Sequence, residues 1–190
     1  MTLAEVIASG GVAVIGTDTV YGVCVDALNE AAVERLLTLK GRPEGKPAAV
    51  AFESVAAALA ALPELGEHVR SALAALLPGP LTLLVANPAR RFPLAGGELL
   101  GVRVLDGLDA GGRPLLLSSA NLAGGPEARR LEDLDPAILA GVDLALDAGE
   151  LRGIPSTVVD LGGFEDDRSW RIVREGAVAA RELQLALLGS

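Results

Sequence analysis

The sequence V-A-V-I-G-T-D-T-V-Y-G, residues 12–22, joins an apolar run to a short polar turn. Residues 12–15 are typical of a buried strand, and Gly16 ends that strand. The turn then presents Thr17, Asp18, Thr19 and Tyr21, whose hydroxyls and carboxylate could hydrogen-bond a small polar ligand. A turn of this composition is more often only a turn. In open α/β sheets, however, binding loops form where strands end, so this position is a candidate site.

Along the rest of the chain, short apolar runs typical of strands alternate with segments whose apolar residues recur at helical spacing. Further strands are expected at residues 48–52, 81–86, 101–105, 115–119, 142–146, 157–161 and 170–173. Helices are expected at residues 30–40, 54–62, 67–77, 131–140 and 179–188, the first capped by Asn29 and stopped by Gly41 and Pro43. This alternation predicts an α/β (α+β) fold, with a mostly parallel or mixed sheet covered by helices.

Length and composition restrict the class of protein. A chain of 190 residues predicts one domain, spanning residues 1–190. No run approaches the roughly 20 apolar residues of a membrane-spanning helix, and the first eight residues contain no basic side chain, unlike a signal peptide. We therefore expect a cytoplasmic protein with no membrane partner. The net charge of −9 argues against broad binding to nucleic acid, although a local basic pocket could still hold a nucleotide.

One cysteine and one histidine exclude several kinds of site. Cys24 and His68 cannot by themselves complete a zinc site, and His68 would be the only base available to a nucleophilic serine or cysteine. Cys24 lies in an apolar stretch and is expected to be a buried packing residue. His68 lies in a helical pattern and is expected to be a solvated residue on the helix surface.

Three more polar clusters follow predicted strands or helices. The sequence K-G-R-P-E-G-K-P, residues 40–47, places three cations after a helix; the helix dipole explains Lys40, whereas Arg42 and Lys46 fit better as phosphate ligands. Ser119 and Asn121 follow the strand at 115–119 and could be only a helix cap. The last cluster joins S-T-V-V-D, residues 156–160, to Arg174, which is also compatible with a plain hairpin and a surface arginine.

In combination and order, these clusters resemble the YrdC-like threonylcarbamoyl-AMP synthases. The matching motifs are T-D-T-V-Y-G at 17–22, K-G-R-P at 40–43, P-G-P-L-T-L at 78–83, G-V-R-V at 101–104, S-A-N at 119–121 and S-T-V-V-D at 156–160. The resemblance extends from about residue 12 to residue 176. It implies a twisted mixed open sheet with flanking helices around a large concave, basic-lined cavity.

That family condenses L-threonine, bicarbonate and ATP to L-threonylcarbamoyladenylate and pyrophosphate. The resemblance therefore implies a nucleotidyltransferase that supplies the intermediate for threonylcarbamoyladenosine modification of tRNA. It also implies that the product passes to a tRNA threonylcarbamoyl transferase complex, with at most weak binding of tRNA itself. The carbamate formed from amine and bicarbonate attacks the α-phosphorus, so no covalent nucleophile is required. Mg²⁺ would be held mainly by the ATP phosphates rather than by a protein metal site.

The resemblance also assigns roles to individual residues. The catalytic set comprises Lys40, Arg42, Ser119 and Asn121. The ATP-binding set comprises Lys40, Arg42, Lys46, Ser119, Asn121 and Arg174. The threonine-binding set comprises Thr19, Arg103 and Ser156, with the Arg103 guanidinium facing the substrate carboxylate. Without the resemblance, Arg103 would be interpreted as a surface arginine on an edge strand.

The chain departs from the family pattern at several positions. Gly16 replaces a proline, which should loosen the first turn; Ala51 stands where many relatives carry histidine, and Glu127 where a serine often helps bind ATP. Residues 105–113 are fewer than usual and lack most of a helix, so one wall of the cavity is in question. The chain also ends without room for the extra C-terminal domain of the longer synthases.

Two other functions are compatible with parts of the sequence. A paralogue could keep the fold but bind another ligand or lack synthase activity; the intact set Lys40, Arg42, Ser119 and Asn121 argues against this. An RNA-binding module could hold duplex RNA on a concave surface. The acidic charge balance disfavours this module, because phosphate contacts require several accessible cations.

Overall fold

The computed structural model describes residues 1–41, 48–122 and 124–188. These residues form one twisted mixed sheet of nine strands in the order β7-β1-β2-β6-β3-β5-β4-β8-β9. The strands are β1 (Ala13–Gly16), β2 (Tyr21–Asp26), β3 (Ala49–Phe52), β4 (Leu81–Ala86), β5 (Leu99–Val104), β6 (Leu115–Ser119), β7 (Leu144–Ala145), β8 (Thr157–Asp160) and β9 (Arg171–Arg174). The pairs β1–β7, β3–β5 and β4–β8 are parallel and the others antiparallel.

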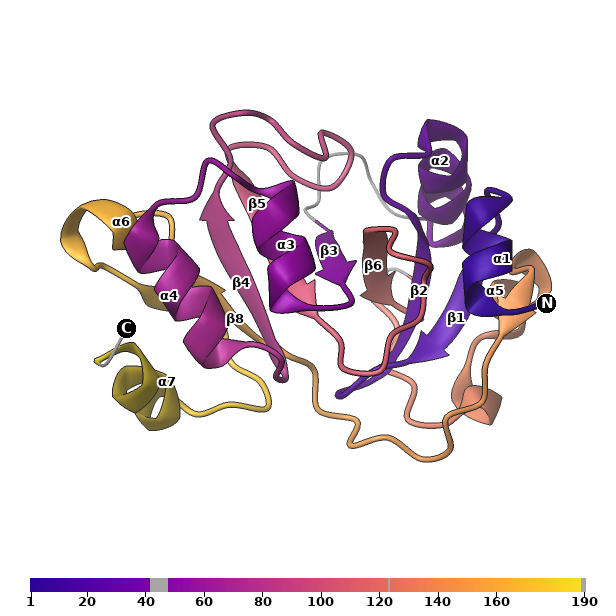
Figure 1. Cartoon of the computed structure of the whole chain (residues 1–190). Helices are drawn as coiled ribbons and strands as arrows, with labels where there is room; N and C mark the ends of the chain where they lie inside the picture. The colour runs from indigo at the N-terminus through magenta and orange to yellow at the C-terminus, as the bar shows by residue number, and fades with distance from the viewer. Residues whose placement is uncertain (42–47, 123, 189–190) are drawn as a thin grey trace.

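Helices flank this sheet (Figure 1). They are α1 (Leu3–Ala8), α2 (Glu30–Leu39), α3 (Val55–Ala61), α4 (Glu67–Leu76), α5 (Pro136–Gly141), α6 (Phe164–Asp167) and α7 (Ala180–Leu187), with a 3₁₀ turn η1 at Leu131–Asp133. α3 contacts β3 and β5, α4 contacts β4, and α2 contacts β2. The expected mixed sheet with flanking helices is therefore confirmed. No helix in the described ranges is long and apolar enough to cross a membrane.

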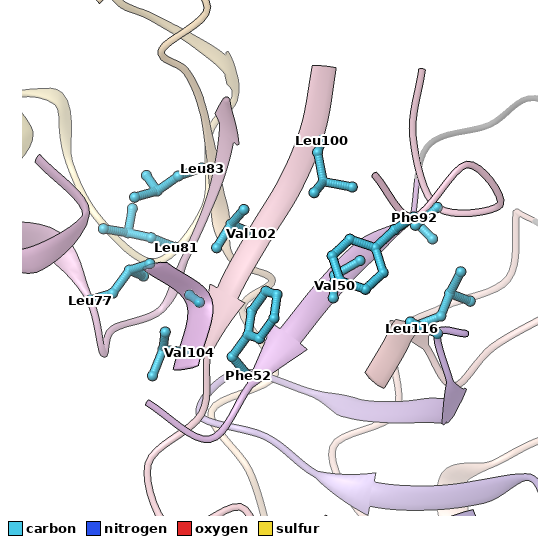
Figure 2. Packing of buried hydrophobic residues seen from close by; sticks show 14 of the residues in the cluster. Val50, Phe52, Leu77, Leu81, Leu83, Phe92, Leu100, Val102, Val104 and Leu116 are labelled. Atoms are coloured by element: carbon cyan, nitrogen blue, oxygen red, sulfur yellow. The ribbon is translucent and has the colours of Figure 1, made fainter. Parts of the chain in front are cut away.

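Alternation along the central strands divides the side chains between two faces of the sheet. In β5, Leu100, Val102 and Val104 belong to the large core cluster, to which α2, α3, α4 and α7 contribute. The Phe52 and Phe92 rings meet edge to face in this cluster, with their centroids 6.0 Å apart (Figure 2). Because neighbouring strand residues point to opposite faces, the residues between these core positions face away from the helices.

The second face is only partly covered. Near β1 and β2 it packs against α1, where Val6 and Ile7 join Ile15 and Cys24 in a smaller core cluster. Farther along the sheet, most positions between core residues are small or polar, namely Ala49, Thr82, Gly101 and Arg103, whereas Leu84 is apolar. This part of the second face is the floor of a cavity.

Several local predictions are confirmed. β4 and β6 have the expected bounds, and Asn29 caps α2 by accepting a hydrogen bond from the Ala32 N–H at 3.1 Å. Gly41 follows α2 with φ of +58°, a conformation that suits glycine after a helix. Cys24 is fully buried, as expected, and His68 is partly exposed on α4. Pro43 lies outside the described residues.

Three local features differ from the predictions. The expected helix at 131–140 is broken, because Asp135 starts a new helix with Pro136 in its first turn, and Pro136 disfavours helical backbone at the residue before it. Strand β2 was not predicted, since all six of its residues are buried and it shows no alternation. Helix α1 was also missed, although Thr2 and Glu5 form a capping box that marks its start.

Candidate functional site

A cavity of about 400 Å³ lies on the face of the sheet opposite α3 and α4. Its volume is in the range of small-molecule sites. Strands from both halves of the sheet and the turn after β1 form its walls. The polar and charged side chains that line it are Thr17, Thr19, Thr82, Arg103, Ser118, Ser119, Glu127, Ser156 and Arg174.

Arg103 is the most buried cation of this lining. It projects from β5, which lies between β3 and β4, so its interpretation as a surface arginine on an edge strand is wrong. Its Nη2 donates to Asp18 Oδ1 in an ion pair and lies 3.4 Å from Thr19 Oγ1. Burial lowers the pKa of the Arg103 guanidinium; the Asp18 charge raises that pKa, and the Arg174 charge lowers it. Since arginine still remains protonated at neutral pH, the cavity holds a permanent buried cation.

The turn after β1 places Asp18 and Thr19 against Arg103. Thr17 closes the turn: its Oγ1 donates to the Val20 carbonyl at 2.6 Å and accepts from the Thr19 and Val20 N–H groups at 3.2 Å. Gly16 stands where relatives carry proline, and we expected this glycine to loosen the turn. The hydroxyl of Thr17 orders the turn instead, through these hydrogen bonds. Such bonds from a short hydroxyl side chain to nearby backbone are typical of turns.

Gly16 itself is required by a close approach of the chain. A Cβ at Gly16 would lie 2.3 Å from the Ala148 Cβ, so this segment leaves no room for a side chain at position 16. The Tyr21 hydroxyl holds the same segment: it donates to Gly149 O at 2.9 Å and accepts from the Ala148 N–H at 2.9 Å. These contacts connect the first motif to the 146–156 connection, which runs along the lower edge of the molecule in Figure 1.

Lys40, Ser119 and Asn121 form a second polar group. Lys40 lies at the end of α2 and is buried, and its Nζ donates to the Ser119 carbonyl and, at 3.3 Å, to Asn121 Oδ1. The Ser119 hydroxyl donates to the same Asn121 oxygen at 2.8 Å. The dipole of α2 therefore does not fully explain Lys40. The helix-cap interpretation of Ser119 and Asn121 is wrong, because no helix begins between them and η1 in the described residues.

Ser156 and Arg174 meet at the opposite wall. β8 and β9 pair as the expected hairpin, which brings the start of one strand to the end of the other. Arg174 Nη2 donates to the Ser156 carbonyl at 2.7 Å and to its hydroxyl at 3.1 Å, and that hydroxyl lies 2.8 Å from Thr82 Oγ1. Ser156, expected to bind threonine, and Arg174, expected to bind ATP, are therefore direct neighbours.

Glu127 contributes a carboxylate to the same cavity. Its Oε2 is buried and has no hydrogen-bond partner among the described residues. A carboxylate oxygen is a preferred ligand of Mg²⁺, and Mg²⁺ in phosphate sites commonly uses one or two carboxylates together with substrate phosphates. Within the described ranges, no group of three or more His, Cys, Asp or Glu residues could hold a metal by itself. The residues present therefore fit Mg²⁺ bound together with a polyphosphate.

A second cavity, of about 930 Å³, adjoins the first. Thr17 lines both cavities. The ion pair joins Asp18, which lines the larger cavity, to Arg103, which lines the smaller one. The short 105–113 segment contributes Asp106, Leu108 and Asp109 to the larger cavity. The short length of residues 105–113 had put one wall of the cavity in question. In the structure this segment borders the 930 Å³ cavity and does not line the 400 Å³ cavity.

The fold gathers residues that are far apart in the sequence. Five of the proposed site residues, Thr19, Arg103, Ser119, Ser156 and Arg174, line the 400 Å³ cavity. Lys40 and Asn121 are hydrogen-bonded to Ser119, one of the residues that line this cavity. Arg42 and Lys46 lie outside the described residues. The carboxylate of Asp18 was expected only as a possible hydrogen-bonding group of the first motif, without a role in either binding set, and Thr82 was not among the sequence candidates.

Residues 5–176 match the family Sua5_yciO_yrdC, described as "Telomere recombination". The chain belongs to the Sua5/YciO/YrdC family. Among its relatives, the threonylcarbamoyl-AMP synthase of Xanthomonas campestris pv. campestris (strain B100) is 38% identical over 183 residues, which cover 89% of this chain and 93% of that protein. The threonylcarbamoyl-AMP synthase of Stenotrophomonas maltophilia (strain K279a) is 36% identical over 159 residues, 77% of this chain and 83% of that protein.

Solved structures of the Sua5/YciO/YrdC family have the same fold. Sua5 from P. abyssi, solved in complex with L-threonine, superposes with a TM-score of 0.84 at 27% identity over 96% of this chain. The chain spans 55% of that longer protein. YciO from E. coli has a TM-score of 0.74 at 25% identity, with 95% of this chain and 90% of YciO covered.

Proposed function

We propose that this chain is an L-threonylcarbamoyladenylate synthase, a nucleotidyltransferase that condenses L-threonine, bicarbonate and ATP with release of pyrophosphate. The observation that carries the proposal is the convergence of Arg103, Ser119 and Arg174, from three distant parts of the sequence, on one 400 Å³ cavity. The names of the related synthases and the threonine complex of Sua5 support it. The product would supply a tRNA threonylcarbamoyl transferase complex.

In this proposal, the buried Arg103 guanidinium binds the threonine carboxylate, beside Thr19. Ser156 and Arg174, which are hydrogen-bonded to each other, would lie where the amino acid meets the nucleotide. Arg174 would balance the negative charge of the phosphates as the carbamate attacks the α-phosphorus and pyrophosphate leaves. The protein contributes alignment of two anions and charge neutralisation, which do not require a covalent nucleophile.

The remaining polar residues complete the ATP side of the cavity. Ser119 would contact the nucleotide. Lys40 holds the Ser119 carbonyl in place, and Asn121 holds the Ser119 hydroxyl. Arg42 and Lys46, outside the described residues, are proposed as further phosphate ligands. When bound, Mg²⁺ neutralises the phosphates; it is held mainly by them, and Glu127 Oε2 is a candidate protein ligand.

The direct test is an assay of pyrophosphate release with ATP, bicarbonate and each of several amino acids. We expect turnover with threonine to exceed turnover with valine, because a site that hydrogen-bonds the hydroxyl leaves polar groups unpaired with the near-isosteric valine. Ser119→Ala should reduce turnover more than it reduces the melting temperature. Equal turnover with every amino acid, or none with any, would contradict the proposal.

An RNA-binding module is the other class of function to be tested. Its signature would be tight binding of duplex RNA with a steep dependence on salt concentration, since phosphate contacts release counterions. The acidic chain, with a net charge of −9, favours weak RNA binding at physiological salt. Tight, salt-sensitive RNA binding without ATP-dependent release of pyrophosphate would replace the synthase proposal.

A further inference from the structure

The Arg103 side chain is only partly hydrogen-bonded in this structure. Its side chain is 8% exposed, and Asp18, 32% exposed, forms the ion pair with its Nη2. The Nε of the same guanidinium is buried and has no hydrogen-bond partner among the described residues. One donor of the guanidinium is therefore paired with a carboxylate of the protein, while another, already out of contact with water, is left without an acceptor.

A guanidinium binds a carboxylate most strongly through two parallel N–H groups. The Nε is covered in this structure, so a carboxylate ligand entering the 400 Å³ cavity approaches the guanidinium at an Nη nitrogen. Asp18 already engages Nη2, one of the two Nη nitrogens, through one of its two N–H groups. Two carboxylates crowded on one guanidinium would also repel each other, since like charges at close range oppose shared binding. Movement of Asp18 from Nη2 would remove this repulsion and leave both N–H groups of that nitrogen to the ligand.

The structure provides space for that movement. Asp18 lines the adjoining 930 Å³ cavity, where a carboxylate that leaves Arg103 would enter a larger volume bordered by residues 105–109. The backbone of Arg103 is held in β5, in the middle of the sheet, and its side chain is largely buried. Rotation of the Asp18 side chain in a turn involves less rearrangement than movement of a central strand.

We propose that Asp18 is an internal competitor for the substrate carboxylate, pairing with Arg103 when the cavity is empty and leaving it for the larger cavity when substrate binds. This inference rests on the proposed function only in assigning Arg103 to a carboxylate ligand. Asp18 has a physical reason to be there, because a buried cation without a partner is strongly destabilising. The same pairing lowers the affinity for substrate, since part of the binding free energy is used to separate Asp18 from Arg103.

The test compares ligand binding to wild type, Asp18→Asn and Asp106→Asn by calorimetric titration without ATP. Asp106 lines the same 930 Å³ cavity and is exposed, so Asp106→Asn is a matched loss of charge. The probes are L-threonine and 3-hydroxybutyrate, which has the carboxylate and hydroxyl but no ammonium group. We expect Asp18→Asn to bind both ligands about tenfold more tightly, equivalent to about 1.4 kcal/mol, and Asp106→Asn to bind them like wild type.

Three results would overturn the inference. Unchanged affinity in Asp18→Asn would show that no competition occurs. Weaker binding of threonine with unchanged binding of 3-hydroxybutyrate would show that Asp18 binds the substrate ammonium instead. An equal gain in Asp106→Asn would attribute the effect to net charge. If melting curves show that Asp18→Asn is unfolded, Asp18→Ser, which also removes the charge, provides the same comparison.

The outcome is separable from that of the proposed function. Tighter carboxylate binding in Asp18→Asn, together with no pyrophosphate release by wild type with any amino acid, would support the competition and reject the synthase activity. Threonine-dependent pyrophosphate release by wild type, with no gain of affinity in Asp18→Asn, would reject only the competition.

Discussion

Arg103 combines deep burial with an unpaired Nε, and its replacement tests the threonine site most directly. Arg103→Lys keeps the positive charge but loses the planar pair of donors, so the carboxylate would be held by a point charge. We expect affinity for threonine to fall at least about tenfold, while affinity for ATP changes much less. Calorimetric titration of each ligand measures both values. Equal losses for the two ligands would argue for a general change of the cavity, and no loss would remove Arg103 from the site.

Glu127 provides a second test at the scale of one residue. Its carboxylate lines the cavity proposed for a polyphosphate, so it should repel ATP that carries no metal. In Glu127→Ser we expect affinity for ATP in the presence of a chelator to rise about tenfold, and affinity with excess Mg²⁺ to change less or to fall. Fluorescence titration with a nucleotide analogue under both conditions gives the comparison.

The matched control for Glu127 is Glu98→Ser, which removes the same charge from an exposed side chain that does not line the cavity. Its affinity for metal-free ATP should remain that of wild type. If both variants gain affinity equally, the effect comes from the net charge of the protein, and Glu127 has no special relation to the phosphates.

The element that carries the first motif depends on close packing between β1 and the segment after β7. Gly16 faces Ala148 so closely that any Cβ would force one of the two segments to move. We expect Gly16→Ala to lower the free energy of unfolding by about 1–3 kcal/mol, the usual effect of overpacking. The shift would also strain the hydrogen bonds of Tyr21 to this segment. Urea denaturation monitored by circular dichroism measures the loss.

Gly97→Ala is the control for that element. A Cβ at Gly97 would meet only the end of the Arg90 side chain, 3.6 Å away, in ordinary van der Waals contact. We therefore expect its free energy of unfolding to remain within about 0.5 kcal/mol of that of wild type. If Gly16→Ala proved as neutral as this control, the proposed contact between Gly16 and the 147–149 segment would be wrong.

At the scale of the whole molecule, Cys24 reports on opening of the sheet. It is fully buried in β2, which pairs with both β1 and β6, and burial raises the pKa of its thiol to about 12. Because the thiolate is the reactive form, we expect a thiol reagent at pH 8 to label the native protein only as fast as it unfolds globally. Labelling kinetics at increasing urea concentration measure this. Rapid labelling without denaturant would show that this part of the sheet opens locally.

Much of the architecture could be predicted from local patterns. Strands with apolar residues and clear boundaries, such as β4 and β6, have the expected limits. β2 escaped prediction because burial on both faces removes the alternation that identifies a strand. The helix expected at 131–140 is instead interrupted at Asp135, because the ring of Pro136 restricts the residue before it.

The sequence by itself determined the alternation of core and cavity residues along β4 and β5, the turn chemistry of Thr17, and the presence of cations and hydroxyls after the strands. These properties depend on residues within a few positions of one another. Only the tertiary structure decided which face of the sheet remained open and which partners met there. Asp18 and Arg103 are 85 positions apart, and Lys40 and Ser119 are 79 apart. Such pairs form only when the whole sheet assembles, because the free energy that holds them together comes from packing across the molecule rather than from either segment.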